Sequence, residues 1–347
     1  MSESVVQMIR DLQVGDEVTG DATQSVFSSI MSGEATSAQI GAILMGLAIH
    51  GETSEIVAGA AKAMRAASTR ISPNAKGLID TCGTGGTGGK GGAKMFNIST
   101  AASLVVAACG VPVAKHGNRA MTSKSGSADV LEALGVQLDI SPEQVADCID
   151  ATGIGFLFAQ TLHPAMRHAG PARRELGVRT VFNLLGPLTN PANAEYQVLG
   201  VYARDKLELV AGALAQLGTR RALVVHGRDG LDEITTTDIT DAILVQADQA
   251  PISFEIDPAA FGMPYAVPVA LAGDDAAANA AILKHIFAGQ PGAGRDIVLL
   301  NAAAALWVAG KVDGIADGIA MAAQAIDTGR VQRTLDALIV FTQHSQA

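Results

Sequence analysis

The stretch that decides the fold is Gly83-Thr84-Gly85-Gly86-Thr87-Gly88-Gly89-Lys90-Gly91-Gly92, in which seven of ten residues are glycine. It lies between an apolar run at 78–82 and a second, helix-like apolar run at 100–109. Glycine loses more conformational entropy on ordering than any other residue, so ordering this segment is costly. Between a strand and a helix, such a loop typically lays backbone N–H groups against phosphate oxygens. A glycine-rich linker is the alternative, but the amide and hydroxyl side chains of Asn97–Thr100 at the helix entrance favour a phosphate-binding loop.

This loop differs from the two commonest phosphate-binding loops. A Walker-type loop requires serine or threonine directly after its lysine, but Lys90 is followed by Gly91. A dinucleotide-binding pattern fits at Gly83, Gly85 and Gly88. Such a pattern arises easily in so glycine-rich a loop, and no ribose-binding carboxylate follows at the usual distance. We therefore expect phosphate binding of another kind.

Two polar clusters follow further apolar runs. Lys115-His116-Gly117-Asn118-Arg119 comes after the run at 111–114, and hydroxyl side chains continue to Ser127. Asp229-Gly230-Leu231-Asp232-Glu233 comes after the run at 222–225. Cations and amides at strand ends suit an anionic ligand at the carboxyl edge of an open sheet, and adjacent carboxylates suit Mg²⁺ that also binds substrate phosphates. A solvated turn is the alternative for any one of these residues.

Hydrophobic periodicity divides the chain into two parts. Apolar residues keep helical spacing from Ile40 to Leu47, and Thr36 with Gln39 predicts a capping box before them. We predict a small all-helical domain at residues 1–72. Strands and helices alternate afterwards, which predicts an α/β domain at 73–347 with a mostly parallel central sheet flanked by helices.

Composition narrows the class of protein further. The formal charge of −10 disfavours a nucleic-acid surface. No apolar run reaches the length of a membrane span, and the first residues do not form a signal peptide. We expect a cytoplasmic protein with neither nucleic acid nor membrane as a partner. Cys82, Cys109 and Cys148 are expected to be reduced thiols that pack in the core.

Six motifs occur in one order along nearly the whole chain, and together they resemble the anthranilate phosphoribosyltransferase family of tryptophan biosynthesis. They are Gly83-Thr84-Gly85-Gly86, Phe96-Asn97-Ile98-Ser99-Thr100, Lys115-His116-Gly117-Asn118-Arg119, Ser125-Gly126-Ser127-Ala128-Asp129, Phe182-Asn183-Leu184-Leu185-Gly186-Pro187-Leu188-Thr189-Asn190-Pro191 and Asp229–Glu233. The third and the fifth of these, which contain Lys-His-Gly-Asn and Asn-Leu-Leu-Gly-Pro, are highly specific. The resemblance implies transfer of the phosphoribosyl group of 5-phosphoribosyl 1-diphosphate to the amine of anthranilate.

The resemblance also implies site residues, which divide by ligand. For phosphoribosyl diphosphate they are Gly83, Gly86, Thr87, Met95, Asn97, Ile98, Ser99, Thr100, Lys115, His116, Gly117, Asn118, Arg119, Ser123 and Ser127. For anthranilate they are Gly83, His116, Asn118 and Arg173, whose guanidinium fork suits a planar carboxylate. Ser99, Asp232 and Glu233 are the implied Mg²⁺ ligands, with two ions per subunit. Lys115 and His116 are the implied electrostatic contributors, and no residue is assigned as an acid or base.

One loop departs from the family pattern. The family usually has aspartate where Thr87 stands and a shorter gap before Asn97, so the segment from Thr87 to Met95 is enlarged. It brings in Lys90 and Lys94. These cations near a polyanionic donor predict donor binding that weakens as salt rises.

Two other classes of protein are alternatives to this assignment. A pyrimidine nucleoside phosphorylase shares the fold, but would continue Met-Ser-Gly-Arg where this chain has His116–Arg119. A non-catalytic nucleic-acid-binding relative is disfavoured by the acidic charge and by the intact pair Asp232 and Glu233. The resemblance implies a homodimer formed through the helical domain, and a helical segment near 162–185 that joins this domain.

Overall fold

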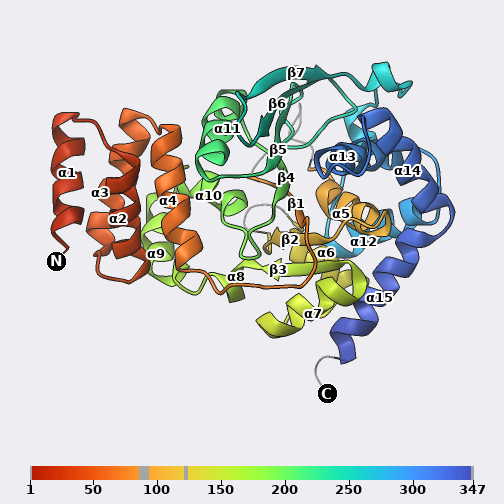
Figure 1. The fold of residues 1–347 in the computed structure, drawn as a ribbon, viewed down its shortest axis with the longest axis horizontal. Helices are drawn as coiled ribbons and strands as arrows, with labels where there is room; N and C mark the ends of the chain where they lie inside the picture. The colour runs from red at the N-terminus through yellow and green to blue at the C-terminus, as the bar shows by residue number, and fades with distance from the viewer. Residues whose placement is uncertain (1, 86–93, 121–123, 345–347) are drawn as a thin grey trace.

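The computed structural model describes residues 2–85, 94–120 and 124–344, and its first four helices form a bundle at one end of the molecule (Figure 1). These helices are α1 (Glu3–Val14), α2 (Gly20–Met31), α3 (Ser37–His50) and α4 (Ser54–Ala66). The predicted capping box forms at the start of α3, where the Thr36 side chain accepts from the Gln39 N–H and the Gln39 side chain accepts from the Thr36 N–H. The helical part of the fold prediction is confirmed.

The rest of the chain is built on one seven-stranded sheet with the order β3-β2-β1-β4-β5-β6-β7. The strands are β1 (Ile79–Gly83), β2 (Val113–Gly117), β3 (Ile154–Phe158), β4 (Tyr196–Gly200), β5 (Arg221–Gly227), β6 (Thr240–Gln246) and β7 (Ile252–Ile256). Strands β1 to β5 pair in parallel, whereas β6 and β7 add to the edge in antiparallel fashion. The mostly parallel sheet is confirmed, and the antiparallel hairpin is an addition to the prediction.

Helices cover both faces of the sheet, as Figure 1 shows. They are α5 (Ile98–Ala108), α6 (Ser127–Leu134), α7 (Pro142–Thr152), α8 (Ala159–Leu162), α9 (Met166–Leu176), α10 (Phe182–Leu188), α11 (Leu207–Gln216), α12 (Ala276–Phe287), α13 (Ala293–Val308), α14 (Ile315–Asp327) and α15 (Arg330–His344), with short 3-10 turns at Arg204–Lys206, Pro258–Phe261 and Pro268–Leu271. The central helices α5 and α13 are buried along most of their length, and they share one apolar core with α12, α14 and α15. None of the described helices is long and apolar enough to cross a bilayer.

A second apolar core joins the helical bundle to the other face of the sheet. It contains buried residues of α1 to α4 together with α9, α10, α11 and the facing side chains of β4, β5 and β6. Helix α9 packs against α2 and α3, and α10 packs against α4. Arg65 of α4 also donates to the Leu188 carbonyl of α10 at 2.7 Å. The expected joining segment near 162–185 therefore lies against the bundle, while the boundary between residues 72 and 73 stays a prediction.

Two candidate site segments lie inside strands, where the sequence analysis expected them after the strand ends. Lys115, His116 and Gly117 are the last three residues of β2, and Gly83 is the last residue of β1. A lysine is accommodated in this buried strand because its ammonium group finds polar partners in the neighbouring strand β1.

Candidate active site

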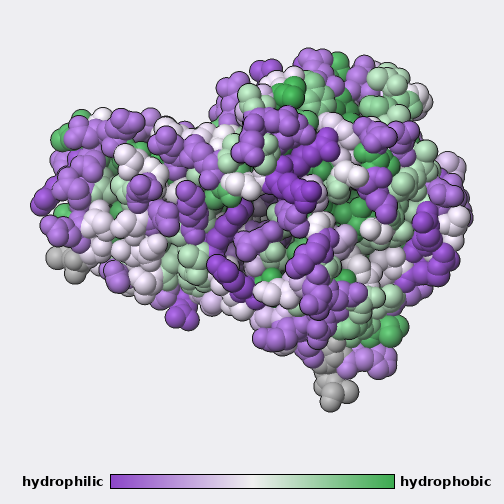
Figure 2. All heavy atoms as spheres, in the orientation of Figure 1, coloured by the Kyte–Doolittle hydropathy of each residue, from purple (hydrophilic) through white to green (hydrophobic). Residues whose placement is uncertain are grey.

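The candidate site lies where the strand order of the sheet reverses. β1 has β2 on one side and β4 on the other, so the connections that leave β1 and β4 run in opposite directions. In open α/β sheets, ligands bind in the crevice at the carboxyl ends of strands at this point. Figure 2 shows hydrophilic side chains around the hollowed middle of this face, beside the helical bundle.

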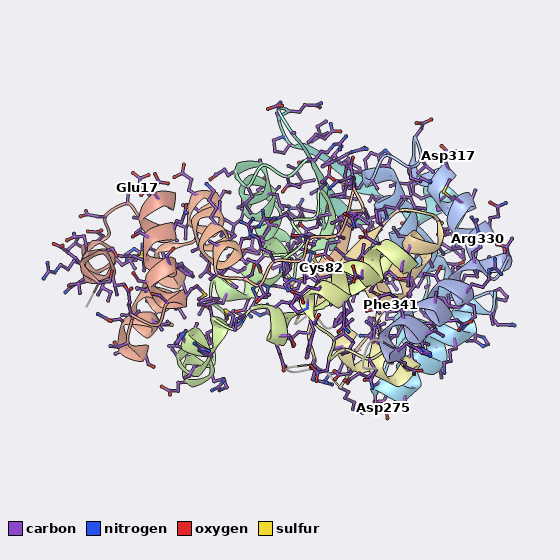
Figure 3. All side chains as sticks on the ribbon, turned by 60° about the horizontal axis from the view of Figure 1, so that its bottom comes forward. Glu17, Cys82, Asp275, Asp317, Arg330 and Phe341 are labelled. Atoms are coloured by element: carbon purple, nitrogen blue, oxygen red, sulfur yellow. The ribbon has the colours of Figure 1, made fainter. Side chains whose placement is uncertain are left out.

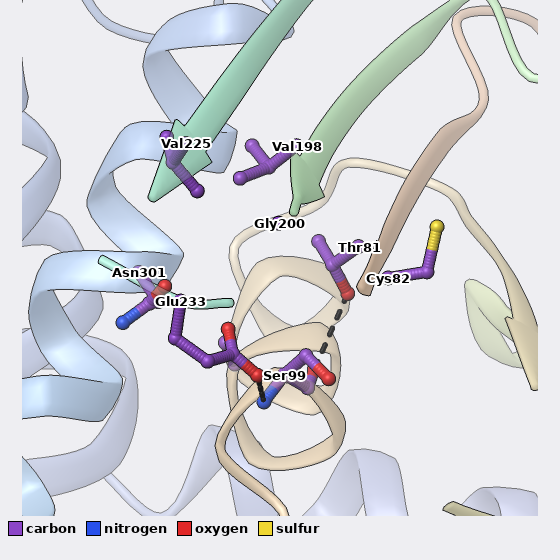
Figure 4. Close-up of a pocket in the computed structure, with 9 residues that line it drawn as sticks. Thr81, Cys82, Ser99, Val198, Gly200, Val225, Glu233 and Asn301 are labelled. Carbon is purple, nitrogen blue, oxygen red and sulfur yellow. Dashed lines mark hydrogen bonds between the residues drawn. The ribbon is translucent and has the colours of Figure 1, made fainter. Parts of the chain in front are cut away.

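The acidic loop after β5 reaches across to the glycine loop and to the start of α5. The Gly85 N–H donates to Asp232 Oδ2 at 2.7 Å, and the Ser99 N–H donates to Glu233 Oε1 at 3.2 Å. Thr81 Oγ1 donates to the Ser99 carbonyl at 3.2 Å (Figure 4). Three segments that are remote in the sequence thus meet at one point.

Both carboxylates of the acidic pair are half-buried. Burial and the neighbouring Asp232 carboxylate raise the pKa of Glu233 to about 8. The positive charge of Lys115 opposes this effect without cancelling it, and a divalent cation would add further positive charge beside the carboxylate. The oxygen donors of Ser99, Asp232 and Glu233 therefore fit a hard ion such as Mg²⁺.

The described residues do not by themselves complete the coordination of a metal ion. Within the described part of the chain, no group of three or more histidine, cysteine, aspartate or glutamate side chains is placed to hold a metal ion. Mg²⁺ commonly takes one or two carboxylates and completes its coordination with water and substrate phosphates. The site thus matches an ion that arrives with its substrate.

A small cavity of about 10 Å³ lies beside Glu233 (Figure 4). Its lining includes Thr81, Ser99, Glu233 and Asn301. This volume is about the space of one water molecule, and the lining offers several polar partners. Asn301 of α13 also holds the acidic loop directly, since it accepts from the Ile234 N–H at 3.0 Å and donates to the Ile234 carbonyl at 2.8 Å.

Lys115 lies below the surface of the site, and only 2% of it is exposed. Its Nζ donates to the Thr81 carbonyl at 2.6 Å and to Ser99 Oγ at 3.4 Å. Burial lowers the pKa of Lys115, and the carboxylates of Asp80 and Glu233 oppose this effect. The Lys115 ammonium group therefore lies beneath Ser99 and places its positive charge next to the site.

Asp80 is a site residue that the sequence analysis missed. It is fully buried in β1 and accepts from the His116 N–H at 3.1 Å and from Asn190 Nδ2 at 2.8 Å. Burial raises the pKa of Asp80, while Lys115 lowers it. The available signal was an aspartate in an otherwise apolar strand, since an ionisable residue is rarely fully buried without a partner.

His116 forms a buried pair with His163. Its Nδ1 lies 3.1 Å from the Gly186 carbonyl, and its Nε2 lies 3.1 Å from Nε2 of His163. A carbonyl only accepts, so Nδ1 of His116 carries the hydrogen and Nε2 of His163 donates to Nε2 of His116. Burial lowers the pKa of His116 to about 3 and that of His163 to about 4. His116 is neutral near pH 7, so the electrostatic role expected of it is reduced to shape and hydrogen bonding.

Arg173 lies on α9, and its guanidinium stacks on the Phe182 ring with 4.9 Å between its central carbon and the ring centroid. Burial lowers the pKa of Arg173. Within residues 2–85, 94–120 and 124–344, no carboxylate forms an ion pair with it. A half-buried guanidinium that lies over a ring and has no ion pair among the described residues could receive a carboxylate from a ligand.

Three polar site candidates lie directly after β2 or at the start of α6. Asn118 Oδ1 accepts from the Arg119 N–H at 2.7 Å and from Gln160 Nε2 at 3.2 Å, so its amide nitrogen points elsewhere. Arg119 is paired with Asp129 and Glu132, which leaves it less available to an anion than expected. Ser127 Oγ donates to the Asn118 carbonyl at 3.3 Å.

Of the remaining candidate residues, some contribute a backbone bridge or are buried, and others lie outside the described residues. Met95 forms an isolated bridge with Ala272, and Ile98 is buried in the first turn of α5. Thr100 is 1% exposed, and its hydroxyl has no hydrogen-bond partner among the described residues. Gly86, Thr87, Lys90 and Ser123 lie outside the described residues.

Cys82 lies near the middle of the molecule, at the site's edge (Figure 3). Burial and the neighbouring Asp80 carboxylate raise the pKa of its thiol, so the thiol stays protonated. All three cysteines are free, which agrees with the packing role expected of them.

Comparison with known proteins identifies the family. Residues 75–332 match a family model described as "Glycosyl transferase family, a/b domain", and residues 6–68 match "Glycosyl transferase family, helical bundle domain". An anthranilate phosphoribosyltransferase from Acetivibrio thermocellus is 51% identical over 85% of this chain and 84% of its own length. The chain belongs to the anthranilate phosphoribosyltransferase family. Another family member, from Methanocorpusculum labreanum, is 48% identical over 97% of this chain and 98% of its own.

Solved structures of anthranilate phosphoribosyltransferases have the same fold. The enzyme from Thermus thermophilus is 40% identical with a TM-score of 0.89, over 97% of this chain and 99% of its own. The enzyme from Saccharomyces cerevisiae, solved in complex with PRPP and Mg, is 25% identical with a TM-score of 0.89, over 99% of each chain. The resemblance inferred from the motifs and the predicted fold class are both confirmed.

Proposed function

We propose that this protein transfers the 5-phosphoribosyl group from 5-phosphoribosyl 1-diphosphate to the amine of anthranilate in tryptophan biosynthesis. A bond forms between the amine nitrogen and the anomeric carbon, the bond to the diphosphate oxygen breaks, and the amine loses one proton. The observation that carries this proposal is the meeting of Gly85, Ser99 and the pair Asp232 and Glu233 at the strand-order reversal. Membership of the family and the PRPP- and Mg-bound yeast relative support it.

The donor would bind at the glycine loop and the start of α5. Gly83, Asn97, Ser99 and Thr100 offer backbone N–H, amide and hydroxyl groups there, and Lys115 adds positive charge from below. Positive charge and fixed dipoles of this kind stabilise a departing diphosphate and an oxocarbenium-like ribose without a covalent intermediate. Because an aromatic amine is unprotonated near pH 7, the reaction does not require a strong base before attack.

Ser99, Asp232 and Glu233 would hold Mg²⁺, with two ions per subunit as the family resemblance implies. Mg²⁺ bound there would offset the negative charge that develops on the diphosphate. The variant Asp232→Asn with Glu233→Gln keeps hydrogen-bond acceptors for Gly85 and Ser99 while removing both charges. We expect turnover at limiting Mg²⁺ to fall by at least ~100-fold with an unchanged circular dichroism spectrum. Near-normal turnover would contradict the metal assignment, and the exposed Glu208→Gln serves as the control.

Anthranilate would bind between the helical bundle and the sheet. Arg173 would receive its carboxylate, and the amide nitrogen of Asn118 would donate to the same substrate. The neutral His116 ring would form a wall of the pocket, held by Gly186 and His163. A planar acid fits this combination because the guanidinium fork and the stacked ring are both flat.

We also propose that the protein forms a homodimer through its helical domain and that it is located in the cytoplasm. Val14 at the end of α1 is 71% exposed and Ile49 near the end of α3 is 74% exposed. These two ends lie close together, since Gly15 and His50 are neighbours. Exposed apolar side chains that gather in this way are typical of a protein–protein contact.

The decisive experiment is an assay with anthranilate, 5-phosphoribosyl 1-diphosphate and Mg²⁺ that follows loss of anthranilate fluorescence. Consumption of anthranilate that depends on the donor supports the proposal. Phosphorolysis of a pyrimidine nucleoside, measured in parallel with inorganic phosphate, would favour the nucleoside phosphorylase alternative. Absence of anthranilate consumption by folded protein would contradict the proposed function.

A further inference from the structure

Asn279 is a buried asparagine on α12 that forms a hydrogen bond with Asn97, at the start of α5 in the candidate donor site. Only 1% of it is exposed. Its Nδ2 donates to Asn97 Oδ1 at 3.0 Å, and its Oδ1 accepts from the Asp274 N–H at 2.9 Å. The start of α12 is marked by Asp275 in Figure 3.

These contacts fix which end of each amide points where. The Asp274 N–H can only donate, so the side-chain oxygen of Asn279 must face it and the nitrogen must face Asn97. Asn97 must then present its oxygen to Asn279. Ser125 Oγ also donates to this oxygen at 3.2 Å. The nitrogen of Asn97 is left on the other side, where it donates over a long 3.4 Å to the Ser125 carbonyl.

The backbone that fixes Asn279 is itself held against the site. The Gly273 N–H donates to the Lys94 carbonyl at 2.8 Å, and the Phe96 N–H donates to the Leu271 carbonyl at 3.2 Å. A Cβ at Gly273 would lie 2.7 Å from both the Phe96 backbone and Asn279 Oδ1, so no side chain fits there. The orientation of Asn279 is therefore set by backbone groups that cannot turn over.

We propose that Asn279 is a positioning residue that orients the Asn97 amide so that its N–H groups face the phosphates of the donor. This inference rests on the proposed function, because it presupposes that Asn97 meets the donor. An amide with its nitrogen toward a phosphate donates to an anion, whereas the turned-over amide would present an oxygen to the same negative charge. Asn279 acts only through Asn97 and touches no reacting atom.

The test is a double-mutant cycle measured by calorimetric binding of 5-phosphoribosyl 1-diphosphate with Mg²⁺ and without anthranilate. Asn279→Leu is close in volume and has no hydrogen-bonding group. It should weaken donor binding about tenfold, the scale of one hydrogen bond to a charged group. Asn97→Ala should weaken it at least as much. If Asn279 acts through Asn97, adding Asn279→Leu to Asn97→Ala should cause no further loss.

A second variant and a control separate orientation from stability. Asn279→Asp still accepts from Asp274 but cannot donate to Asn97, so it should weaken donor binding at least as much as Asn279→Leu. Thr342→Val on α15 removes a buried hydroxyl that accepts from the Gln137 N–H, far from the site, and should lower the melting temperature without changing donor binding. Additive losses in the double variant, or unchanged donor binding in Asn279→Leu, would overturn the inference. If the parent protein itself fails to bind the donor, the proposed function fails instead.

Discussion

Buried ionisable side chains in this protein are stabilised in groups and not one by one. Asp80 is fully buried and has Lys115, Asn190 and the His116 N–H around it. Removing one member of such a group leaves a charge without a partner, which is more costly than losing the pair together. Arg173 differs because it lies over an aromatic ring and forms no ion pair among the described residues, and the partner that we propose for it is the carboxylate of a ligand.

Arg173→Ala should raise the KM for anthranilate by about 30-fold or more, since truncating one partner of a buried charge pair costs about 2 kcal/mol or more. The KM for the donor should change little. Arg174→Ala on the same helix is the control, because Arg174 is exposed. Steady-state kinetics with each substrate varied in turn measures the difference, and equal effects on both substrates would indicate a structural arginine.

The pair His116 and His163 predicts how stability depends on pH. Their folded pKa values of about 3 and about 4 lie below the ordinary value of 6.5, so the unfolded chain takes up protons first as pH falls. The stabilisation is present above pH 6.5 and is lost as pH falls toward 4 and then 3. Each ring should contribute a loss of about 2 kcal/mol between pH 7 and pH 5. Urea unfolding of the parent and of His163→Gln tests this, since the variant should show a shallower decline, and parallel declines would contradict the assignment.

At the scale of elements, the ends of β1 and β4 are kept free of side chains so that the acidic loop can cross them. A Cβ at Gly200 would lie 1.7 Å from the Asp232 carbonyl oxygen, and one at Gly83 would lie 2.4 Å from Asp232 Oδ2. The Gly200 carbonyl also accepts from the Thr84 N–H at 2.9 Å. The strand ends and the loop thus fit together by close backbone approach.

Gly200→Ala should displace the acidic loop, because the atom it collides with is backbone and cannot rotate away. We expect loss of Mg²⁺-dependent donor binding and a lower melting temperature. Gly41→Ala on α3 is the control, because a Cβ at Gly41 meets no atom within 4 Å. Gly41→Ala should therefore keep the melting temperature and the donor binding of the parent. Differential scanning calorimetry and donor titration measure both effects, and a parent-like Gly200→Ala would refute the close-approach argument.

Local patterns in the sequence were sufficient for much of the fold. The predicted capping box at Thr36 forms, because a cap depends on residues only three positions apart. The hairpin of β6 and β7 was not predicted, since strand direction depends on pairing with a distant partner. Asp80 and Asn190 are 110 residues apart, so nothing near either one signals their hydrogen bond. The acidic pair was found because adjacent carboxylates are visible in the sequence, but its burial depends on the crossing of β1 and β4.

At the scale of the whole molecule, the helical bundle has an inner surface and an exposed outer end, and we propose a different function for each. Its inner surface shares a core with the sheet, and its outer end presents Val14 and Ile49 to solvent. Glu52 in the bundle and Lys206 after β4 form an ion pair at 3.3 Å that ties the bundle to the α/β domain. In the proposed function, dimer formation and substrate binding therefore use different sides of this small domain.

Ile49→Glu should convert the proposed dimer to a monomer, since it puts a charge into an apolar contact. Light scattering after size-exclusion chromatography measures the mass, and circular dichroism checks that the helices are kept. Val340→Glu on α15 is the matched control, because Val340 is also an exposed β-branched apolar side chain but lies outside the bundle. A parent mass for Ile49→Glu, or a parent that is monomeric at micromolar concentration, would contradict the proposed interface.

The meeting of remote segments at the strand-order reversal also bears on when this protein becomes active during its synthesis. Asn301 and Asn279 hold the acidic loop and Asn97 from helices that are translated near the end of the chain. Contacts between residues that are far apart in the sequence form slowly, and large proteins reach them through partly folded intermediates. A nascent chain that has emerged only as far as β7 would have all seven strands of the sheet but neither Asn279 nor Asn301. We therefore expect ribosome-bound chains to gain affinity for the donor only after α13 has left the exit tunnel, long after the glycine loop itself has appeared.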